Sequence, residues 1–241
     1  MTNKELAKVH AKNRAKLNSA LTHHKQQMNL SIKSENELIA NVNIRMYLIL
    51  YVAWLENSLQ YIINVYHKQI NSYLRNDILS KRSQIDMWEF LIKAKFREHY
   101  LQGKQKDFNI LNLGHSNYNR YDYLINTILP RVSSFIEIRN KLAHGQWAVA
   151  LNNEGTDKVQ ETTAKIWTLN KKDTLLAKNI LEKFVKIIDS LVASKSAFVK
   201  NFDQNVYKIE HSLYQFDTKY EWIISDMKRK YNAVSRDIVK K

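Results

Sequence analysis

Hydrophobic residues recur at spacings of three and four along most of the chain, which is the pattern of amphipathic helices. The first such stretch, residues 4–30, carries only a thin apolar stripe, so its helix needs a partner to be stable. The second opens at Ser34, which has the spacing of a capping box with Glu37, and stays apolar as far as Ile63. We expect this second helix to be the centre of the core.

The same periodicity predicts two further helices, at residues 81–101 and 121–144. Pro130 either kinks the latter or occupies the first turn of its second half. Gly145 is placed to end it, because glycine readily takes the left-handed conformation that follows a helix.

After Gly145 the period changes. Trp147, Val149 and Leu151 alternate with polar or small residues, and residues 164–169 are able to pair with them. The pattern predicts a small β-hairpin with a long loop near 147–169.

Helical spacing returns at residue 172. Between Phe198 and Met227 the apolar positions alternate in steps of three and four, which indicates a coiled coil or a helical hairpin. The partner of this seam is either the N-terminal helix or the same seam of a second subunit.

Composition agrees with a mainly α protein, because four glycines and one proline leave few tight turns. The glycines stand too far apart for a phosphate-binding or dinucleotide-binding loop. The absence of cysteine excludes disulfides and thiolate chemistry and fits a cytoplasmic location. The longest apolar run, residues 46–55, is too short to span a membrane, and the first residues lack the apolar core of a secretory signal.

The formal charge of +15 is concentrated at the two ends of the chain. Residues 1–33 and 171–241 each carry +6, whereas residues 34–170 carry +3. Such an excess attracts nucleic acid. A lysine-rich proteome would produce the same composition, so charge alone does not choose between the two explanations.

The stretch "IEIRNKLAHGQW", residues 136–147, concentrates the candidate chemistry. On a helical wheel Arg139 falls beside the apolar face, so its charge must meet an acid, an anionic ligand or a subunit interface. Asn140 and His144 share a neighbouring face. An arginine, an amide and a histidine suit a phosphodiester, and the 2′-hydroxyl of RNA is a built-in nucleophile that requires neither metal nor cofactor.

A purely structural explanation is open for each of these residues. Arg139 could pair with a buried acid such as Glu56, and His144 could cap the carbonyls that end its helix. Lys141 stands four residues after Glu137, which predicts a surface ion pair. The histidines show no metal-ligand spacing, so no metal site is expected.

The segment "RNKLAHGQW", preceded by "PRVSSFIEI", resembles the R-x4-H signature of the HEPN superfamily, with Arg139 and His144 at its two fixed positions and Asn140 as the polar residue. The earlier "YVAWLENSLQYII" is similar to the first core helix of these domains and carries Glu56. The likeness covers about residues 35–200. It implies a bundle of four or five helices that dimerises, so that two motifs form one cleft. Many members are metal-independent endoribonucleases that act as toxins, antiphage effectors or RNA-processing enzymes.

On this resemblance we expect a HEPN-like bundle at 34–200, a basic N-terminal helix at 1–33 and a long basic C-terminal helix at 201–241. The expected partners are RNA, a second copy of the chain and an antitoxin or other defence protein. The expected catalytic residues are Arg139, Asn140 and His144; Glu56 and Lys141 would support them, and Gln146 and Trp147 would contact RNA.

Gln146 departs from one subgroup, in which a tyrosine two residues after the histidine is the target of nucleotidyl transfer, so that mode of control is not expected here. The alternative function is a non-catalytic HEPN module that binds nucleic acid, nucleotide or a protein. A third reading is a coiled-coil assembly protein with a structural motif.

Overall fold

The computed structural model describes the backbone of residues 1–239 and the side chains of residues 1–231. Within this part of the chain the fold is all-α, as the sequence predicts, and contains no strand. The helices are α1 (Asn3–Lys33), α2 (Glu37–Val65), α3 (Ser72–Leu79), α4 (Gln84–Leu101), α5 (Ile110–Leu113), α6 (His115–Tyr123), the π-helical turn η1 (Leu124–Ile128), α7 (Leu129–Ala143), α8 (Gln160–Thr168), α9 (Lys171–Ala193) and α10 (Lys195–Val239).

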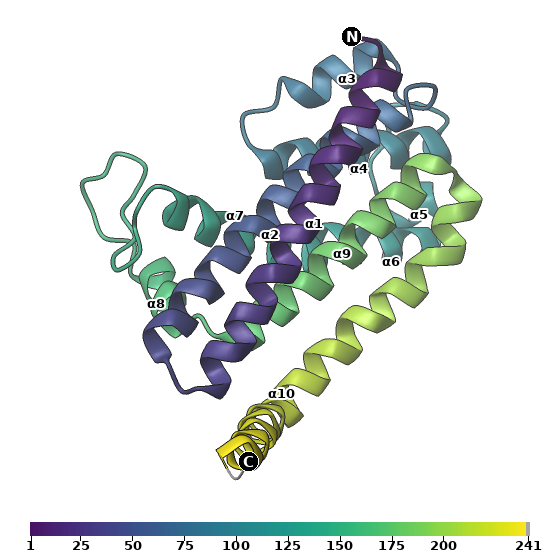
Figure 1. Cartoon of the computed structure of the whole chain (residues 1–241). Coiled ribbons are helices and arrows are strands. Elements are labelled where there is room, and N and C mark those ends of the chain that lie inside the picture. The colour runs from purple at the N-terminus through teal and green to yellow at the C-terminus, as the bar shows by residue number, and fades with distance from the viewer. Residues whose placement is uncertain (240–241) are drawn as a thin grey trace.

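Two long helical hairpins, α1–α2 and α9–α10, lie side by side and form the body of the molecule (Figure 1). α2 packs against α1, α7 and α9, and its side chains at Leu48, Val52, Leu55 and Leu59 are almost completely buried. Full burial of one such side chain contributes about 1.5–3 kcal/mol. The prediction that this segment is the core helix is therefore confirmed.

By length and composition alone, α2 is also the one helix of the described residues that could cross a membrane. Half of its most apolar window is buried inside the bundle. Its apolar surface thus already has protein partners.

The turn between α1 and α2 differs from the predicted one. Ser34 ends α1 instead of starting α2, and its N–H donates to the Leu30 carbonyl at 2.9 Å. Asn36 is the N-cap of α2, with its side chain accepting from the Ile39 N–H at 3.1 Å. The prediction of a helix here is confirmed, but the predicted N-cap, Ser34, is wrong. Asn36 directly precedes the first turn and accepts the hydrogen bond that Ser34 was expected to accept.

Pro130 lies in the first turn of α7, directly after the π-helical turn. Proline has no N–H and its ring clashes with the carbonyl four residues earlier, so a regular α-helix cannot pass through it undisturbed. The wider turn at Leu124–Ile128 absorbs this break, with the Leu129 N–H donating to the Leu124 carbonyl. α6, η1 and α7 follow one another without a loop.

The β-hairpin predicted near 147–169 is wrong. Residues 160–168 form α8, and the loop before it contains a single isolated bridge between Leu151 and Lys158. β-branched residues favour strands locally, but Thr162, Thr163 and Ile166 fall on one helical face and are buried together. Tertiary packing therefore overrides the local preference.

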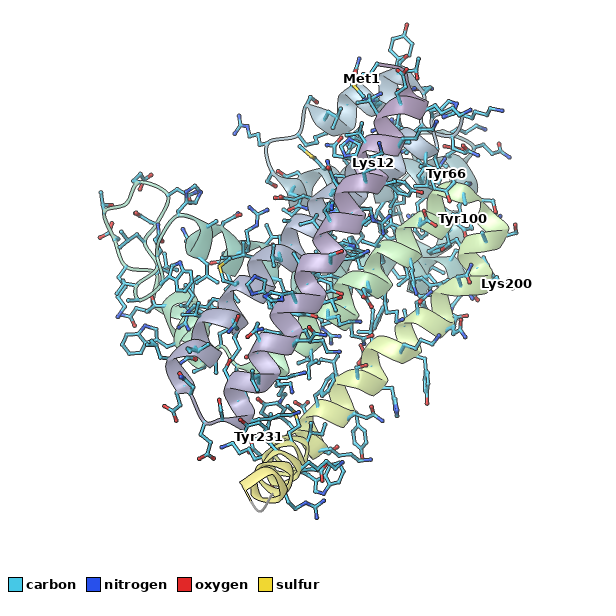
Figure 2. All side chains as sticks on the ribbon, viewed as in Figure 1. Met1, Lys12, Tyr66, Tyr100, Lys200 and Tyr231 are labelled. Atoms are coloured by element: carbon cyan, nitrogen blue, oxygen red, sulfur yellow. The ribbon has the colours of Figure 1, made fainter. Side chains whose placement is uncertain are left out.

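The C-terminal seam packs mainly on α9 of its own chain, which the sequence did not predict as its partner, and the predicted N-terminal helix α1 makes only a minor contact with α10. Phe198, Phe202 and Ile209 are buried there, and the Arg120–Asp203 ion pair (2.9 Å) ties α10 to α6. Figure 2 shows that Lys200 and Tyr231 lie far apart, because α10 runs the length of the body. The predicted N-terminal, central and C-terminal segments all contribute to one hydrophobic core, for instance through Met28, Leu55 and Ile209.

If α10 is an integral part of the bundle, Phe198→Ala will lower the free energy of unfolding by about 3–5 kcal/mol, because it removes a fully buried ring. Tyr207→Ala, on the exposed face of the same helix, will change it by less than about 0.5 kcal/mol. Urea unfolding followed by circular dichroism measures both. Equal effects of the two substitutions would mean that α10 is not anchored as described.

Candidate functional site

The end of α7 positions the R-x4-H residues. His144 is the last, half-helical residue, and Gly145 follows with a φ of +77°. The Gly145 N–H donates to the Leu142 carbonyl at 3.1 Å, and the Gln146 N–H donates to the Lys141 carbonyl at 2.9 Å. This pair of bonds is a Schellman motif, and it confirms the predicted helix stop at Gly145.

Arg139 points inward, as its place beside the apolar face predicts. Its side chain is 17% exposed and forms an ion pair with Glu56 of α2, whose side chain is 44% exposed. Burial lowers the pKa of the Arg139 guanidinium, which nevertheless remains a cation at neutral pH. Its Nε and Nη2 are buried and neither forms a hydrogen bond with a described residue, although Nη2 forms the ion pair with Glu56. The chain thus supplies one counter-charge but leaves a donor of this arginine unused.

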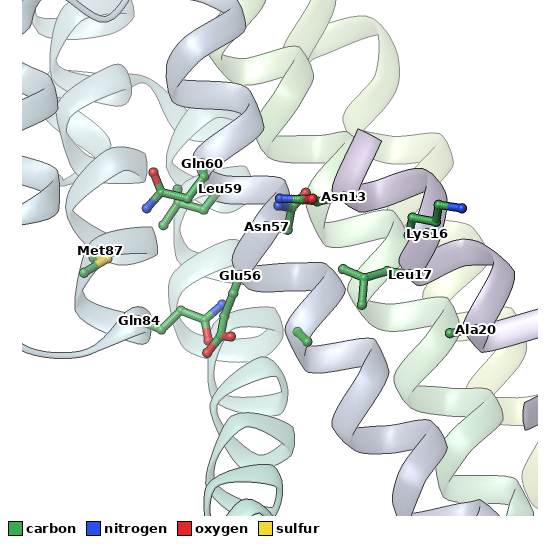
Figure 3. A pocket seen from close by; sticks show the side chains of 11 residues that line it. Asn13, Lys16, Leu17, Ala20, Glu56, Asn57, Leu59, Gln60, Gln84 and Met87 are labelled. Carbon is green, nitrogen blue, oxygen red and sulfur yellow. The ribbon is translucent and has the colours of Figure 1, made fainter. Parts of the chain in front are cut away.

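Glu56 also lines an open groove of about 910 Å³ between α1, α2 and the start of α4. Figure 3 shows Gln84 and Glu56 pointing toward one another, and the Gln84 amide nitrogen, when directed at Glu56, donates to Oε1 at 3.3 Å. The remaining walls combine small or apolar side chains with amides and a lysine. The polar side chains around the groove are Asn13, Lys16, Glu56, Asn57, Gln60 and Gln84.

Asn140 and His144 are exposed, and neither side chain forms a hydrogen bond or ion pair with another described residue. The structure therefore does not join the three predicted catalytic side chains by direct contacts. Asn140 and His144 are open to solvent at the end of α7, while Arg139 is turned toward α2.

Lys141 does not form the predicted ion pair with Glu137. The Lys141 Nζ donates to the Leu151 carbonyl at 2.6 Å, and Glu137 accepts a hydrogen bond from the Thr162 hydroxyl. Both residues face the loop and α8, which sequence spacing could not show. Their role in the structure is to hold this loop on α7.

Gln146 and Trp147 serve the same loop. The Gln146 Oε1 accepts from the Leu151 N–H at 2.8 Å, and the Trp147 Nε1 donates to the Leu142 carbonyl at 2.9 Å. The Arg45 guanidinium lies over the Trp147 ring, 5.9 Å from its centre. Contact of these residues with RNA remains a prediction, and the groove residues on α1 and α4 had no signal in the sequence.

Comparisons with family models, with curated proteins and with solved structures find no match to this chain. Among residues 1–231, no group of three or more histidine, aspartate or glutamate side chains is placed to hold a metal ion. The features of this chain that bear on function are therefore the R-x4-H residues, Glu56 and the groove that Glu56 lines.

Substitution of Glu56 will measure how much its ion pair with Arg139 contributes to the free energy of unfolding. Glu56→Ala leaves a largely buried guanidinium without its carboxylate, and we expect a loss of about 1–2 kcal/mol in the free energy of unfolding. The double variant Glu56→Leu with Arg139→Met, which removes both charges, will recover most of that loss. Urea unfolding measures the three proteins.

Glu89→Ala is the matched control, because the cation of the Glu89–Lys93 pair is 38% exposed, against 17% for Arg139, and such a surface pair is worth less than about 0.5 kcal/mol. If Glu56→Ala costs no more than Glu89→Ala, the Arg139–Glu56 pair does not stabilise the bundle.

Proposed function

We propose that this chain is a metal-independent endoribonuclease of HEPN type, which cleaves RNA at a site completed by a second copy of the chain. The observation that carries the proposal is the state of Arg139. Its guanidinium is desolvated and held in place by Glu56, and its buried Nε–H lacks a partner. An unsatisfied buried donor is costly. A phosphate oxygen is the acceptor that would satisfy it most strongly.

The reaction needs only groups that RNA and the motif supply. The 2′-oxygen loses its proton to a base and attacks the adjacent phosphorus, and the bond from phosphorus to the 5′-oxygen breaks. The products are a 2′,3′-cyclic phosphate and a 5′-hydroxyl. Arg139 would stabilise the charge on the phosphoryl oxygens, Asn140 would hold one of these oxygens, and His144 would move the proton.

A second copy of the chain would bring the exposed residues to the arginine. Within one chain, Asn140 and His144 have no contact that directs them to Arg139, and all three lie at the same end of α7. A partner motif docked at this end would place its His144 opposite the first chain's Arg139. An antitoxin or defence protein that covered the same end would silence the site.

The basic termini would gather the substrate. α1 and the segment from residue 171 onward carry most of the excess positive charge, and neutralised phosphates release counterions on binding. RNA binding should therefore weaken steeply with salt.

A second candidate is a non-catalytic helical scaffold or binding module. The observation that favours it is again the Arg139–Glu56 pair, because an arginine with a partner in its own chain already has a structural role. In that case the doubly apolar variant at these two positions would keep the protein's function.

Incubation of the purified protein with total RNA in EDTA tests the nuclease proposal. Wild type should cleave, and Arg139→Ala and His144→Ala should each lose at least about 100-fold in rate, because each removes one contribution to the transition state. The new ends should be a cyclic phosphate and a 5′-hydroxyl. His67→Ala, which changes an exposed histidine outside the motif, is the control and should cleave as wild type does. Intact RNA with wild type, or equal rates for all four proteins, would contradict the proposal.

Expression in a growing host separates the two candidates. A nuclease toxin should arrest growth, and His144→Ala should relieve the arrest at equal protein levels. Growth that is unaffected by the wild type, or arrested equally by His144→Ala, favours the scaffold.

A further inference from the structure

A second pocket, of about 600 Å³, lies where the end of α1, the start of α2, the start of α9 and the far half of α10 meet. Its apolar wall is formed by Ile32, Ala40, Ile44 and Ile224. Lys171, the first residue of α9, lines the pocket and is only 5% exposed. We call it the Lys171 pocket.

Lys171 is a buried cation without a counter-charge. The one polar contact of its Nζ among the described side chains is the thioether sulfur of Met227, at 2.8 Å. A thioether is a weak acceptor and carries no charge. Lys25 and Lys33 of α1 are close enough to disfavour the charged form further. Buried charges in proteins are normally paired.

Three of the carboxylates nearby are engaged elsewhere. Glu35 pairs with Lys228 at 2.9 Å, and Asp173 accepts from the Asn170 N–H at 2.8 Å as part of the α9 capping box. Asp217 pairs with the neighbouring Lys172 at 2.5 Å. Glu37, on the wall at the start of α2, forms no ion pair with Lys171.

The amino-terminal ends of two helices add to the positive electrostatic potential in the Lys171 pocket. α2 and α9 both begin at the pocket, where their first N–H groups favour a negative charge. Tyr220 of α10 lines the same pocket as Lys171, and burial raises the pKa of its phenol.

The ammonium of Lys171 keeps its charge near neutrality. Burial, and then Lys25 and Lys33, lower its pKa to about 8, so that the protonated form still dominates at pH 7. Glu37 is exposed at the wall, whereas Lys171 is the buried charge of the pocket. A buried ammonium without an ion-pair partner, an apolar wall and room for a small molecule fit an amphipathic anion.

We propose that the Lys171 pocket binds a small organic monoanion, whose head group pairs with Lys171 and whose apolar body rests on Ile32, Ile44 and Ile224. A carboxylate is the preferred head group, because one charge is uncompensated. The site is independent of the proposed nuclease function, since Glu56 lies twelve residues beyond Ile44 on α2, about 18 Å along the helix.

Thermal unfolding in the presence of hexanoate, with hexan-1-ol as the neutral probe of equal length, tests the proposal. Hexanoate should raise the Tm of wild type in a saturable manner, and hexan-1-ol should not. Lys171→Met, which keeps the size of the side chain but removes the charge, should lose the response to hexanoate. Lys172→Met, the adjacent control, and Lys171→Arg, which retains the charge, should keep it.

Two further measurements, the Tm without ligand and its dependence on pH, show whether Lys171→Met still folds and whether Lys171 is a buried charge. Without ligand, Lys171→Met should unfold at a higher temperature than wild type at pH 7, because it removes a buried unpaired charge, and circular dichroism should show unchanged helix. The difference in Tm between Lys171→Met and wild type should decrease between pH 7 and pH 9.5. There the native lysine is already neutral while the unfolded lysine still binds its proton, so the stability of wild type rises.

Hexanoate binding to wild type should weaken by about tenfold or more over the same interval, since the amine loses its charge. Absence of a hexanoate response in wild type, or an equal response in Lys171→Met, would overturn the proposal. A larger response to hexyl phosphate than to hexanoate would overturn its assignment to a monoanion.

Discussion

The burial of α2 is the constraint on which the rest of the molecule depends. This helix is apolar on most of its circumference, and it is covered from separate directions by α1, α7 and α9. Glu56 is the one acid within its apolar stretch, so it must lie where the cover is incomplete. It does so at the groove beside α4, and there it receives Arg139 from α7. The position of the candidate site thus follows from the packing of the core helix.

In the proposed nuclease, Arg139 would serve both stability and chemistry. An arginine that only stabilised the bundle would have its donors satisfied by its own chain, whereas here neither Nε nor Nη2 forms a hydrogen bond, although Nη2 is paired with Glu56. A guanidinium that only bound substrate would be exposed and poorly oriented. In the proposed nuclease, a fixed, desolvated arginine with unsatisfied donors would combine both properties, because preorganised donors stabilise developing charge on a phosphate.

The long helices could be predicted from the sequence because their periodicity is sustained. The stripe from Phe198 to Ile209, the apolar run around Leu55 and the stop at Gly145 are all local signals, and each is confirmed. The predictions that are wrong concern features that tertiary contacts determine. Asn36 rather than Ser34 caps α2, and Thr163 with Ile166 turns a predicted strand into α8.

The two pockets were beyond sequence reasoning for the same reason. Each is assembled from helices that are distant in the chain, and the chemistry appears only when these helices meet. Asn13 of α1 and Gln84 of α4 line the same groove as Glu56, and Lys171 lines a pocket with the end of α1 and the far half of α10. In contrast, the place of Arg139 beside the apolar face could be derived from the helical wheel, and that inference led to its partner Glu56 on α2.

The central claim is that the Arg139 of one chain works with the His144 of another. Co-expression of Arg139→Ala and His144→Ala chains, followed by RNA cleavage in EDTA, tests it most directly. Each variant alone should be inactive, whereas the mixture should regain about a quarter of wild-type activity, because half of the dimers are mixed and each mixed dimer holds one complete site. A mixture as inactive as its separate components would contradict a site shared between two chains.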